Sequence, residues 1–176
     1  MPDSSTLLVD PSIVRRMLRR MAFEIAERNH GVESVVIVGI RRRGVLVADV
    51  LAAYLGEISD TVIDVQALDT ASYRDDRVEN TAGKDESSIE VDLTGKDVVL
   101  VDDVLYTGRT VRAALDGIVR YGRPKSIQLA VLIDRGHREY PIRPDFVGRV
   151  VPTKHKEHVA VRAEDDFAIY VVEDAA

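Results

Sequence analysis

Two adjacent carboxylates and a short turn rich in hydroxyl groups lie close together in the sequence. Asp102 and Asp103 come directly after the apolar run 98–101, and the turn Thr-Gly-Arg-Thr occupies 107–110. Amides at a helix N-terminus bind phosphate, glycine lets the backbone approach the anion, and threonine hydroxyls add donors. Ionised carboxylates only accept hydrogen bonds, which suits the diol of a sugar. The segment 98–110 therefore predicts a binding site for a ribose and its own 5′-phosphate.

An ordinary explanation also exists for part of this segment, because two acids after a strand often belong to a helix-capping loop. Here an apolar strand, the acid pair, an aliphatic pair and the Thr-Gly-Arg-Thr turn occur together and in that order. This combination favours a ligand site. It is neither a Walker A motif, which needs Gly-Lys-Ser/Thr, nor a Gly-x-Gly-x-x-Gly dinucleotide turn.

A second loop carries three consecutive arginines, Arg41, Arg42 and Arg43, between Gly39 and Gly44. Arginine donates hydrogen bonds in a planar fork that suits a diphosphate. In isolation these residues would fit a solvated basic turn. Beside the segment 98–110, a diphosphate-binding loop is favoured.

The elements that must position these residues alternate between helices and strands. Asp10-Pro11 predicts a helix start, and the apolar stripe that follows predicts a helix to about Asn29. Short β-branched runs predict buried strands. The expected helices are 10–29, 44–54 and 107–121, and the expected strands are 34–40, 61–68, 89–93, 97–101, 126–134, 146–151, 158–163 and 168–173.

This order predicts an α/β fold with a mainly parallel central sheet flanked by helices on both faces. Ligands in such folds bind beyond the carboxyl ends of the strands. The polar stretch 69–88 is too long for an ordinary connection. It is expected to be a functional lid, although a disordered insertion would also cost little.

The composition excludes several classes of protein. The chain has 176 residues, 45% hydrophobic and 31% charged, and it has no cysteine. Disulfides, a thiol nucleophile and cysteine-based metal sites are therefore excluded. No apolar run approaches the roughly 20 residues that a membrane span needs, and the N-terminus lacks the features of a signal peptide. We expect one domain over 1–176, located in the cytoplasm and with no membrane partner.

Basic residues gather in one part of an acidic chain. The net charge is −6, yet 135–158 carries six Lys and Arg against three Asp and Glu, and three of the four histidines. An acidic average therefore does not exclude a polyanion partner. On charge alone, a solvated basic face is the simpler explanation.

The segment 98–110 resembles the 5-phosphoribosyl-1-diphosphate (PRPP) motif of type I phosphoribosyltransferases. Segments at 73–76, 122–124, 129–139, 141–143 and 151–153 resemble one subfamily, the bifunctional pyrimidine operon attenuation regulators that are also uracil phosphoribosyltransferases. The resemblance covers about 10–161. It implies the type I fold, with a flexible lid at about 69–88 and a small hood formed by about 135–163 together with N-terminal elements.

The resemblance assigns roles in a transfer that converts uracil and PRPP to UMP and diphosphate. Asp102 and Asp103 are expected to hold the ribose hydroxyls and Arg74 to reach the diphosphate, which makes these three the expected catalytic residues. The family's diphosphate loop usually reads Thr-Arg-Gly, so Arg43 matches and Arg42 departs. Tyr106 stands where purine-specific members commonly carry an acid, which argues against purine transfer. The expected substrate-binding residues are Arg42, Arg43, Asp102, Asp103, Val104, Leu105, Tyr106, Thr107, Gly108, Arg109, Thr110, Arg135 and Val159.

The cofactor expected is Mg²⁺ carried mainly by substrate oxygens, which suits its hard, hydrated character. No metal site made by the protein is expected, because His155 and His158 lack further ligands.

The family's regulators bind an mRNA hairpin and promote termination when a uridine nucleotide is bound. The resemblance therefore implies UMP or UTP, an mRNA leader hairpin and further copies of the chain, as a homodimer or larger homo-oligomer, as partners. Aromatic residues are only 5% of the chain, which favours structured RNA read through shape and backbone over an extended stacking platform. The expected RNA-binding residues are Arg16, Arg19, Arg20, His137, Arg138, Arg143 and Arg149.

Two alternatives stay open. One is a nucleotide-sensing RNA regulator whose transferase site is vestigial. The other is a phosphoribosyltransferase for another base, without a role in RNA binding.

Overall fold

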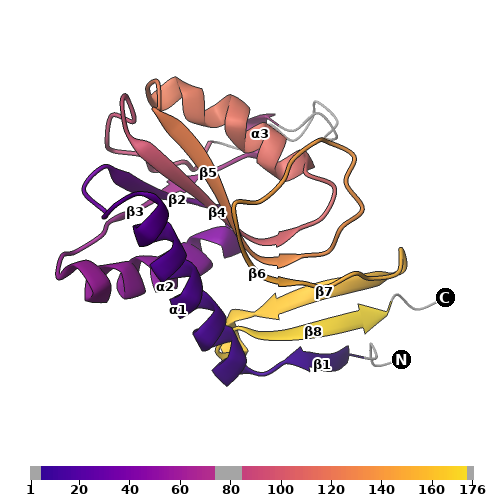
Figure 1. The fold of residues 1–176 in the computed structure, drawn as a ribbon. Coiled ribbons are helices and arrows are strands. Elements are labelled where there is room, and N and C mark those ends of the chain that lie inside the picture. The colour runs from indigo at the N-terminus through magenta and orange to yellow at the C-terminus, as the bar shows by residue number, and fades with distance from the viewer. Residues whose placement is uncertain (1–4, 74–84, 174–176) are drawn as a thin grey trace.

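The computed structural model describes residues 5–73 and 85–173, which form two β-sheets and three α-helices (Figure 1). The larger sheet is parallel, with strand order β3-β2-β4-β5-β6, and the smaller one is antiparallel, with order β1-β8-β7. The elements in chain order are β1 (Ser5–Val9), α1 (Pro11–Arg28), β2 (Val35–Ile40), α2 (Arg43–Ser59), β3 (Val65–Leu68), β4 (Asp97–Leu105), α3 (Arg109–Ile118), β5 (Ser126–Asp134), β6 (Phe146–Val150), β7 (Glu157–Arg162) and β8 (Ala168–Glu173).

Helices cover both faces of the parallel sheet, as predicted. Successive side chains of β4 alternate between the faces: Val99 and Val101 pack with α1 and α2, whereas Val98 and Leu100 pack with α3. All four valine and leucine side chains are fully buried. A strand that is buried on both faces reads as a continuous apolar run, which is why the sequence pattern identified β4 and β5. Figure 1 shows α3 on one side of the sheet and α1 and α2 on the other.

The first helix begins where its capping signal predicts. The Asp10 carboxylate accepts hydrogen bonds from the amides of Ser12 and Ile13, at 2.9 and 3.2 Å, and Pro11 is the first helical residue. The predicted apolar stripe is buried: Val14, Met17, Leu18, Met21, Ala22 and Ile25. Hence the opposite side of α1 faces solvent.

The structure corrects the ends of two helices. α2 continues past Tyr54 and Gly56 to Ser59, because the chain leaves the helix only at Asp60, where φ is 52°. α3 begins at Arg109 rather than Thr107 because Gly108 is its N-cap, and a separate turn of 3₁₀-helix covers 119–121.

The strands also differ from the expectation in places. β3 begins at Val65 rather than 61, because 61–64 turns back over the end of α2. No strand forms at 89–93, where the amides of Glu90 and Leu93 bond instead to the side chain of Gln66 and the carbonyl oxygen of Tyr121. The strand β1 was not predicted, because its few residues show no alternation of polar and apolar side chains that would distinguish a strand from a loop. It pairs with β8, so both ends of the described chain meet in the small sheet.

None of the helices within 5–73 and 85–173 combines the length and the apolar character that a membrane crossing needs.

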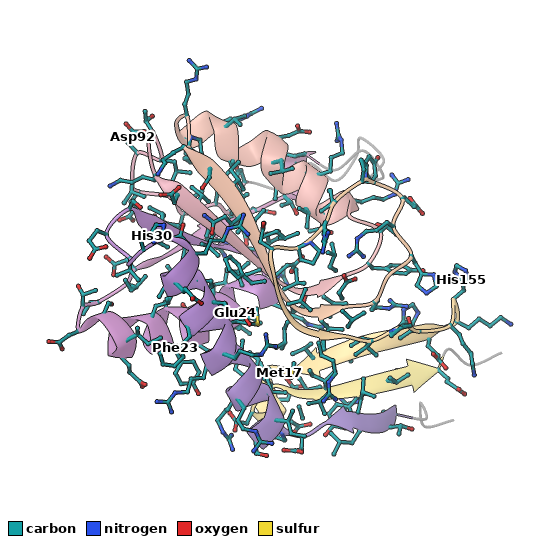
Figure 2. All side chains as sticks on the ribbon, viewed as in Figure 1. Met17, Phe23, Glu24, His30, Asp92 and His155 are labelled. Carbon is teal, nitrogen blue, oxygen red and sulfur yellow. The ribbon has the colours of Figure 1, made fainter. Side chains whose placement is uncertain are left out.

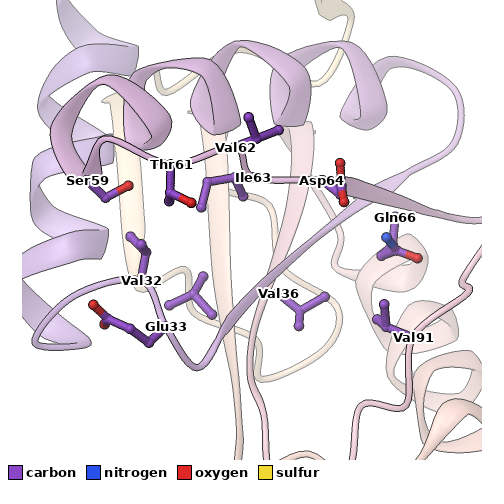
Figure 3. Close-up of a pocket in the computed structure, with 11 residues that line it drawn as sticks. Val32, Glu33, Val36, Ser59, Thr61, Val62, Ile63, Asp64, Gln66 and Val91 are labelled. Atoms are coloured by element: carbon purple, nitrogen blue, oxygen red, sulfur yellow. The ribbon is translucent and has the colours of Figure 1, made fainter.

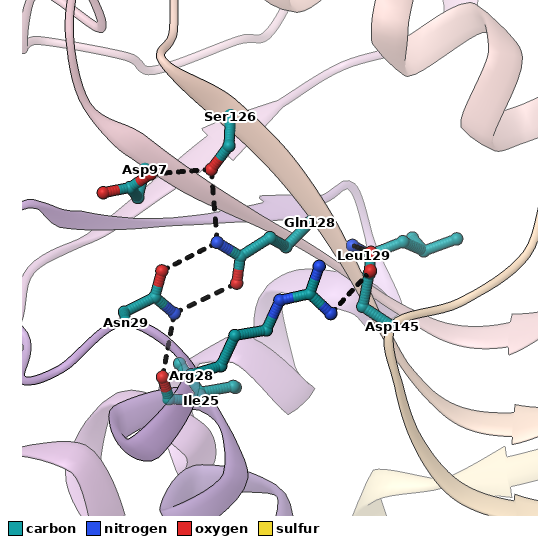
Figure 4. A network of polar contacts seen from close by, with 8 residues as sticks. All are labelled: Ile25, Arg28, Asn29, Asp97, Ser126, Gln128, Leu129 and Asp145. Atoms are coloured by element: carbon teal, nitrogen blue, oxygen red, sulfur yellow. Dashed lines mark hydrogen bonds and ion pairs between the residues drawn. The ribbon is translucent and has the colours of Figure 1, made fainter.

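A polar network joins the end of α1 to the starts of β4 and β5 (Figure 4). The side-chain amides of Asn29 and Gln128 exchange two hydrogen bonds of 3.0 and 2.7 Å, and Gln128 also donates to Ser126 Oγ. Ser126 and Ser34 each donate a hydroxyl hydrogen bond of 2.7 Å to the Asp97 carboxylate. These two hydrogen bonds, with a smaller contribution from Lys125, hold the pKa of Asp97 below its ordinary value of 3.8.

We predict that Asp97→Ala lowers the free energy of unfolding at neutral pH by about 1–3 kcal/mol, because two half-buried hydroxyls lose a charged acceptor. A lowered folded-state pKa means that this stabilisation is present above the ordinary carboxyl pKa and is lost as the pH falls through the folded value. Urea unfolding of wild type and variant across this acidic range measures the difference.

The exposed Asp116→Asn on α3 is the matched control. Its free energy of unfolding is expected to lie within about 0.5 kcal/mol of that of wild type. If the difference in free energy of unfolding between wild type and Asp97→Ala stayed constant or grew as the pH fell, the network's role would be contradicted.

Candidate active site

The two carboxylates lie inside β4 and not after it, because the strand pairs with β5 as far as Leu105. Asp102 is 8% exposed, and the Asp103 side chain is 14% exposed. The amide of Asp103 donates to Asp102 Oδ1 and the amide of Val104 donates to Asp103 Oδ1, both at 2.9 Å. The strand itself thus orients both carboxylates at the carboxyl end of the sheet.

The loop of three arginines reaches the same end of the sheet. Arg43 Nη1 lies 3.9 Å from Asp103 Oδ2, and Arg41 Nη1 lies 3.6 Å from Glu86 Oε2. The peptide bond between Arg41 and Arg42 is cis. All three arginines are exposed, so their guanidinium groups can meet an anion beside the acid pair.

Close backbone packing at Gly44 brings this loop to the carboxylates. A Cβ atom at Gly44 would lie 2.5 Å from the carbonyl oxygen of Val101 and 3.1 Å from Cα of Asp102. Both atoms belong to the backbone of β4 and cannot move aside, so glycine is required at the first turn of α2.

The turn before α3 has the form of an anion site. Gly108 adopts a left-handed conformation with φ of 90°, which glycine tolerates without strain. Thr107 Oγ1 accepts from the Arg109 amide at 3.3 Å, and Thr110 lies in the first helical turn. The amides of 108–110 therefore stand at the positive end of the α3 dipole.

The segment 136–142 is tied to this turn. The Arg138 guanidinium donates to the carbonyl oxygens of Tyr106 and Ile142, both at 2.9 Å, and to that of Gly136 at 3.2 Å. It also pairs with the Asp134 carboxylate at 2.7 Å. Arg138 was predicted to contact RNA. In the structure its guanidinium donates its hydrogen bonds to acceptors within the protein.

Neighbouring residues strengthen the same link. The amides of Glu139 and Tyr140 donate to the carbonyl oxygen of Thr107, at 2.9 and 3.1 Å. Arg109 pairs with the Glu139 carboxylate at 2.6 Å and lies over the Tyr140 ring at 5.3 Å. The Arg109 side chain therefore braces the turn, while its amide lies in the first turn of α3. Glu139 and Tyr140 were missed, because an isolated acid and an isolated aromatic give no signal in the sequence.

A buried arginine, Arg135, stacks on Tyr106 just beyond the end of β4, and together these two side chains form one wall of the site. Arg135 is only 5% exposed, and its guanidinium lies 4.0 Å from the centre of the Tyr106 ring. It donates to Thr153 Oγ1 at 3.1 Å and to the carbonyl oxygen of Glu157. Burial lowers the pKa of Arg135, but an arginine remains protonated in proteins. Val159 on β7 is also buried, at 8% exposed.

Both ends of the predicted lid are described, at 69–73 and 85–88. Asp69 Oδ2 accepts from the amide of Glu86 at 3.2 Å, the Asp69 amide donates to Ser87 Oγ at 2.8 Å, and Tyr73 packs under Arg120. The two ends therefore leave the body of the protein side by side. The predicted catalytic Arg74 lies outside the described residues.

The other predicted RNA-binding residues lie in two places. Arg16, Arg19 and Arg20 are exposed on α1, and Arg20 bonds to the carbonyl oxygens of Val147 and Gly148 on β6, the strand that carries Arg149. His137 instead contacts the ring of His155, and Figure 2 shows His155 across the molecule from α1. His137 therefore lies apart from the arginines of α1. Arg143 is exposed, and in the sequence it lies between His137 and Arg149.

A cavity of about 390 Å³ lies at the other end of the sheet, where β2 and β3 begin (Figure 3). Val32, Glu33, Val36, Val62 and Asp64 are among its lining residues. None of the predicted site residues lines it, so it plays no part in the arrangement described above.

The fold is a parallel sheet covered by helices on both faces, with carboxylates and arginines gathered at the carboxyl end of its strands. A family model described as the phosphoribosyl transferase domain matches residues 7–164. Solved structures agree on the fold. A glutamine mutant from an analysis of an invariant aspartic acid in HPRTs has a TM-score of 0.76 at 18% identity, covering 97% of this chain and 96% of the other. Hypoxanthine-guanine phosphoribosyltransferase of Bacillus anthracis has a TM-score of 0.69 at 18% identity, covering 99% and 100%.

Relatives found by sequence share a higher identity with this chain than these structures do. The "Bifunctional protein PyrR" of Bacillus cereus (strain AH820) is 49% identical over 167 residues, and that of Clostridium novyi (strain NT) is 47% identical over 165, each covering 93% of both chains. The "Pyrimidine operon regulatory protein" of Lactococcus lactis subsp. cremoris (strain MG1363) is 48% identical over 158 residues, covering 90% of both chains. The chain therefore belongs to the phosphoribosyl transferase domain family and, within it, to the PyrR proteins.

Proposed function

We propose that the protein transfers the phosphoribosyl group of PRPP to uracil, forming UMP and diphosphate, and regulates a pyrimidine operon by binding its mRNA leader when a uridine nucleotide is bound. The observation that carries the enzymatic part is the convergence of the β4 carboxylates, the arginine loop and the α3 turn at one end of the sheet. The relatives' names, bifunctional and pyrimidine operon regulatory, support the second part.

The ribose phosphate half of PRPP matches β4 and the turn that follows it. Asp102 and Asp103 accept hydrogen bonds from the two ribose hydroxyls, and the amides and hydroxyls of 107–110 hold the 5′-phosphate. Both groups belong to one continuous strand-turn-helix segment. The ribose is therefore held at two points with little freedom, which favours a reactive orientation.

The diphosphate half matches the loop before α2. Arg42 and Arg43, with Arg41 beside them, carry the charge that stabilises a departing diphosphate. As the bond between the ribosyl carbon and the diphosphate oxygen breaks, N1 of uracil forms the new bond, the electron pair leaves with the diphosphate, and the N1 proton is released to the diphosphate or to water. Arg74 on the predicted lid is proposed to join this loop and help to exclude water from the cation-like carbon.

Mg²⁺ is the proposed cofactor, held mainly by oxygens of PRPP. Within 5–73 and 85–173 no group of three or more His, Cys, Asp or Glu could enclose a metal, whereas Asp102 and Asp103 offer the hard oxygen donors that Mg²⁺ accepts. When bound, the ion would neutralise charge on the diphosphate.

The base is proposed to bind against Tyr106, Arg135 and Val159. The acid that purine-specific members commonly carry is replaced by Tyr106, whose ring is fixed by the guanidinium 4.0 Å away. The donors of Arg135 and neighbouring backbone amides suit the two carbonyl oxygens of uracil. Because Arg135 also bonds to Thr153 and Glu157, the wall is fixed before the base arrives.

For the regulatory part, the exposed arginines of α1 offer phosphate contacts. The protein would meet its transcript in the cytoplasm. Self-association stays a prediction.

We predict that Asp102→Asn combined with Asp103→Asn largely abolishes formation of UMP from uracil and PRPP, because the ribose loses both charged acceptors. Circular dichroism and thermal unfolding check that the double variant folds. Exposed Asp116→Asn serves as control and should keep wild-type turnover. Near-normal turnover in the folded double variant would refute the assignment of the acid pair.

For RNA, we predict that Arg16→Gln combined with Arg19→Gln reduces the salt dependence of binding to the hairpin of the operon leader. The slope of log affinity against log salt should fall by roughly 0.7–0.9 for each lost phosphate contact. UMP should tighten RNA binding, and RNA should tighten UMP binding by the same factor.

Filter binding at several salt concentrations, with and without UMP, measures these effects. An unrelated hairpin of equal length is the control. If wild type bound both hairpins equally, the regulatory part of the proposal would fail and the transferase would stand alone.

A further inference from the structure

The cavity at the amino end of the parallel sheet has apolar walls that are open to solvent. Val36 on β2, Val62 in the connection from α2 to β3, and Val91 all line it (Figure 3). Val62 is 87% exposed and Val91 is 40% exposed. Sites for small molecules are hollows of roughly 300–1,000 Å³ with mostly apolar walls and a few polar groups. At about 390 Å³ this cavity has the size and the walls of such a site.

A buried hydrogen-bond donor faces the cavity. Gln66 on β3 is only 8% exposed, and its Oε1 accepts a hydrogen bond of 2.8 Å from the Glu90 amide. This bond fixes the side-chain amide, so Nε2 points the other way, and Figure 3 shows it on the side of Val36. Within 5–73 and 85–173, Gln66 Nε2 donates to no protein group. Because a buried donor without an acceptor is costly, Gln66 Nε2 favours a ligand that brings an oxygen atom.

The charges in the lining have one sign. Asp64 stands two residues before Gln66, and Figure 3 shows Glu33 on the opposite side of the cavity. Neither carboxylate forms an ion pair or a hydrogen bond with another residue in the described part of the chain. The eleven lining residues include no Lys, Arg or His. The cavity therefore attracts cations and repels phosphates, unlike the site at the carboxyl end of the sheet.

We propose that this cavity binds a small organic cation, namely a primary amine that carries a branched apolar group and a carbonyl oxygen beside the amine. The ammonium group pairs with Asp64, while the carbonyl oxygen accepts from Gln66 Nε2. The apolar group covers Val36 and Val62, and Glu33 adds negative potential from the far side. α-Amino amides combine these three groups within one small molecule. The inference goes beyond the proposed function and does not rest on it.

The probe is L-leucinamide, compared with three molecules that each change one of its groups. 4-Methylpentanamide lacks the ammonium group, 3-methylbutylamine lacks the carbonyl oxygen, and L-leucine adds a carboxylate. Each is titrated into the full-length wild-type protein while backbone amide signals are followed by ¹⁵N NMR. Leucinamide should produce saturable shifts at 32–36, 59–66 and 91. The other three molecules should bind more weakly, L-leucine because its carboxylate is repelled by Asp64.

Two changes in the lining test the assigned contacts. Asp64→Asn combined with Glu33→Gln should weaken leucinamide binding by roughly 2- to 30-fold, the range for loss of two exposed charge interactions. Gln66→Glu keeps the acceptor for the Glu90 amide but removes the donor, so the preference for leucinamide over 3-methylbutylamine should disappear.

The matched control is Asp60→Asn, an exposed carboxylate next to the cavity in sequence but outside its lining. Asparagine tolerates the φ of 52° at this position, so the control should fold and bind leucinamide as wild type does. Asp64 and Glu33 are exposed too, so their double variant should also fold and should form UMP at the wild-type rate.

The inference is overturned if leucinamide gives no saturable shift, if 4-methylpentanamide binds equally well, or if the Asp64 and Glu33 double variant binds leucinamide as wild type does. It is also overturned if that double variant changes the molecular mass in analytical ultracentrifugation, because the cavity would then belong to a contact between copies of the chain. A protein that forms UMP without binding leucinamide refutes this inference and leaves the proposed function intact.

Discussion

The arrangement of the site depends on the contact between two backbones at Gly44. A Cβ atom there would lie 2.5 Å from the carbonyl oxygen of Val101, so α2 can start against β4 only because this residue has no side chain. The contact brings the arginine loop beside the carboxylates of the central strand, with Arg43 Nη1 3.9 Å from Asp103 Oδ2. Cationic groups for the diphosphate and acceptors for the ribose are therefore positioned by main chain, which moves less than side chains do.

Two other arginines organise the remainder of the site from within. Arg138 ties the segment 136–142 to the carbonyl oxygen of Tyr106, and Arg135 joins the Tyr106 ring to Thr153 and Glu157. The turn proposed for the 5′-phosphate and the wall proposed for the base thus share Tyr106. Arg16 and Arg19, which are exposed, lie on a different element, α1.

The main features of the fold could be predicted because its strands are buried on both faces and its first helix carries a cap. β5 and β8 have the predicted bounds, and the apolar stripe of α1 is the buried one. Polar residues inside helices and strands were harder to place from the sequence. Asp102 and Asp103 were expected after their strand, because charge normally marks a strand's end, but pairing with β5 carries β4 past them. Contacts between distant residues left no local signal. Arg138 was predicted to contact RNA, and nothing in the sequence indicated its acceptors at 106 and 134–142, which only the tertiary fold brings together.

The central claim is that this site transfers phosphoribosyl groups to uracil. The most direct measurement incubates the wild-type protein with Mg²⁺ and PRPP in the presence of uracil, hypoxanthine or orotate, and separates the products by chromatography. The account predicts UMP and diphosphate from uracil, with no nucleotide from the other two bases. Transfer to hypoxanthine or orotate in place of uracil would contradict the role of Tyr106 and Arg135 at the base. Tight binding of UMP without transfer to any base would show instead a regulator whose catalytic site is vestigial.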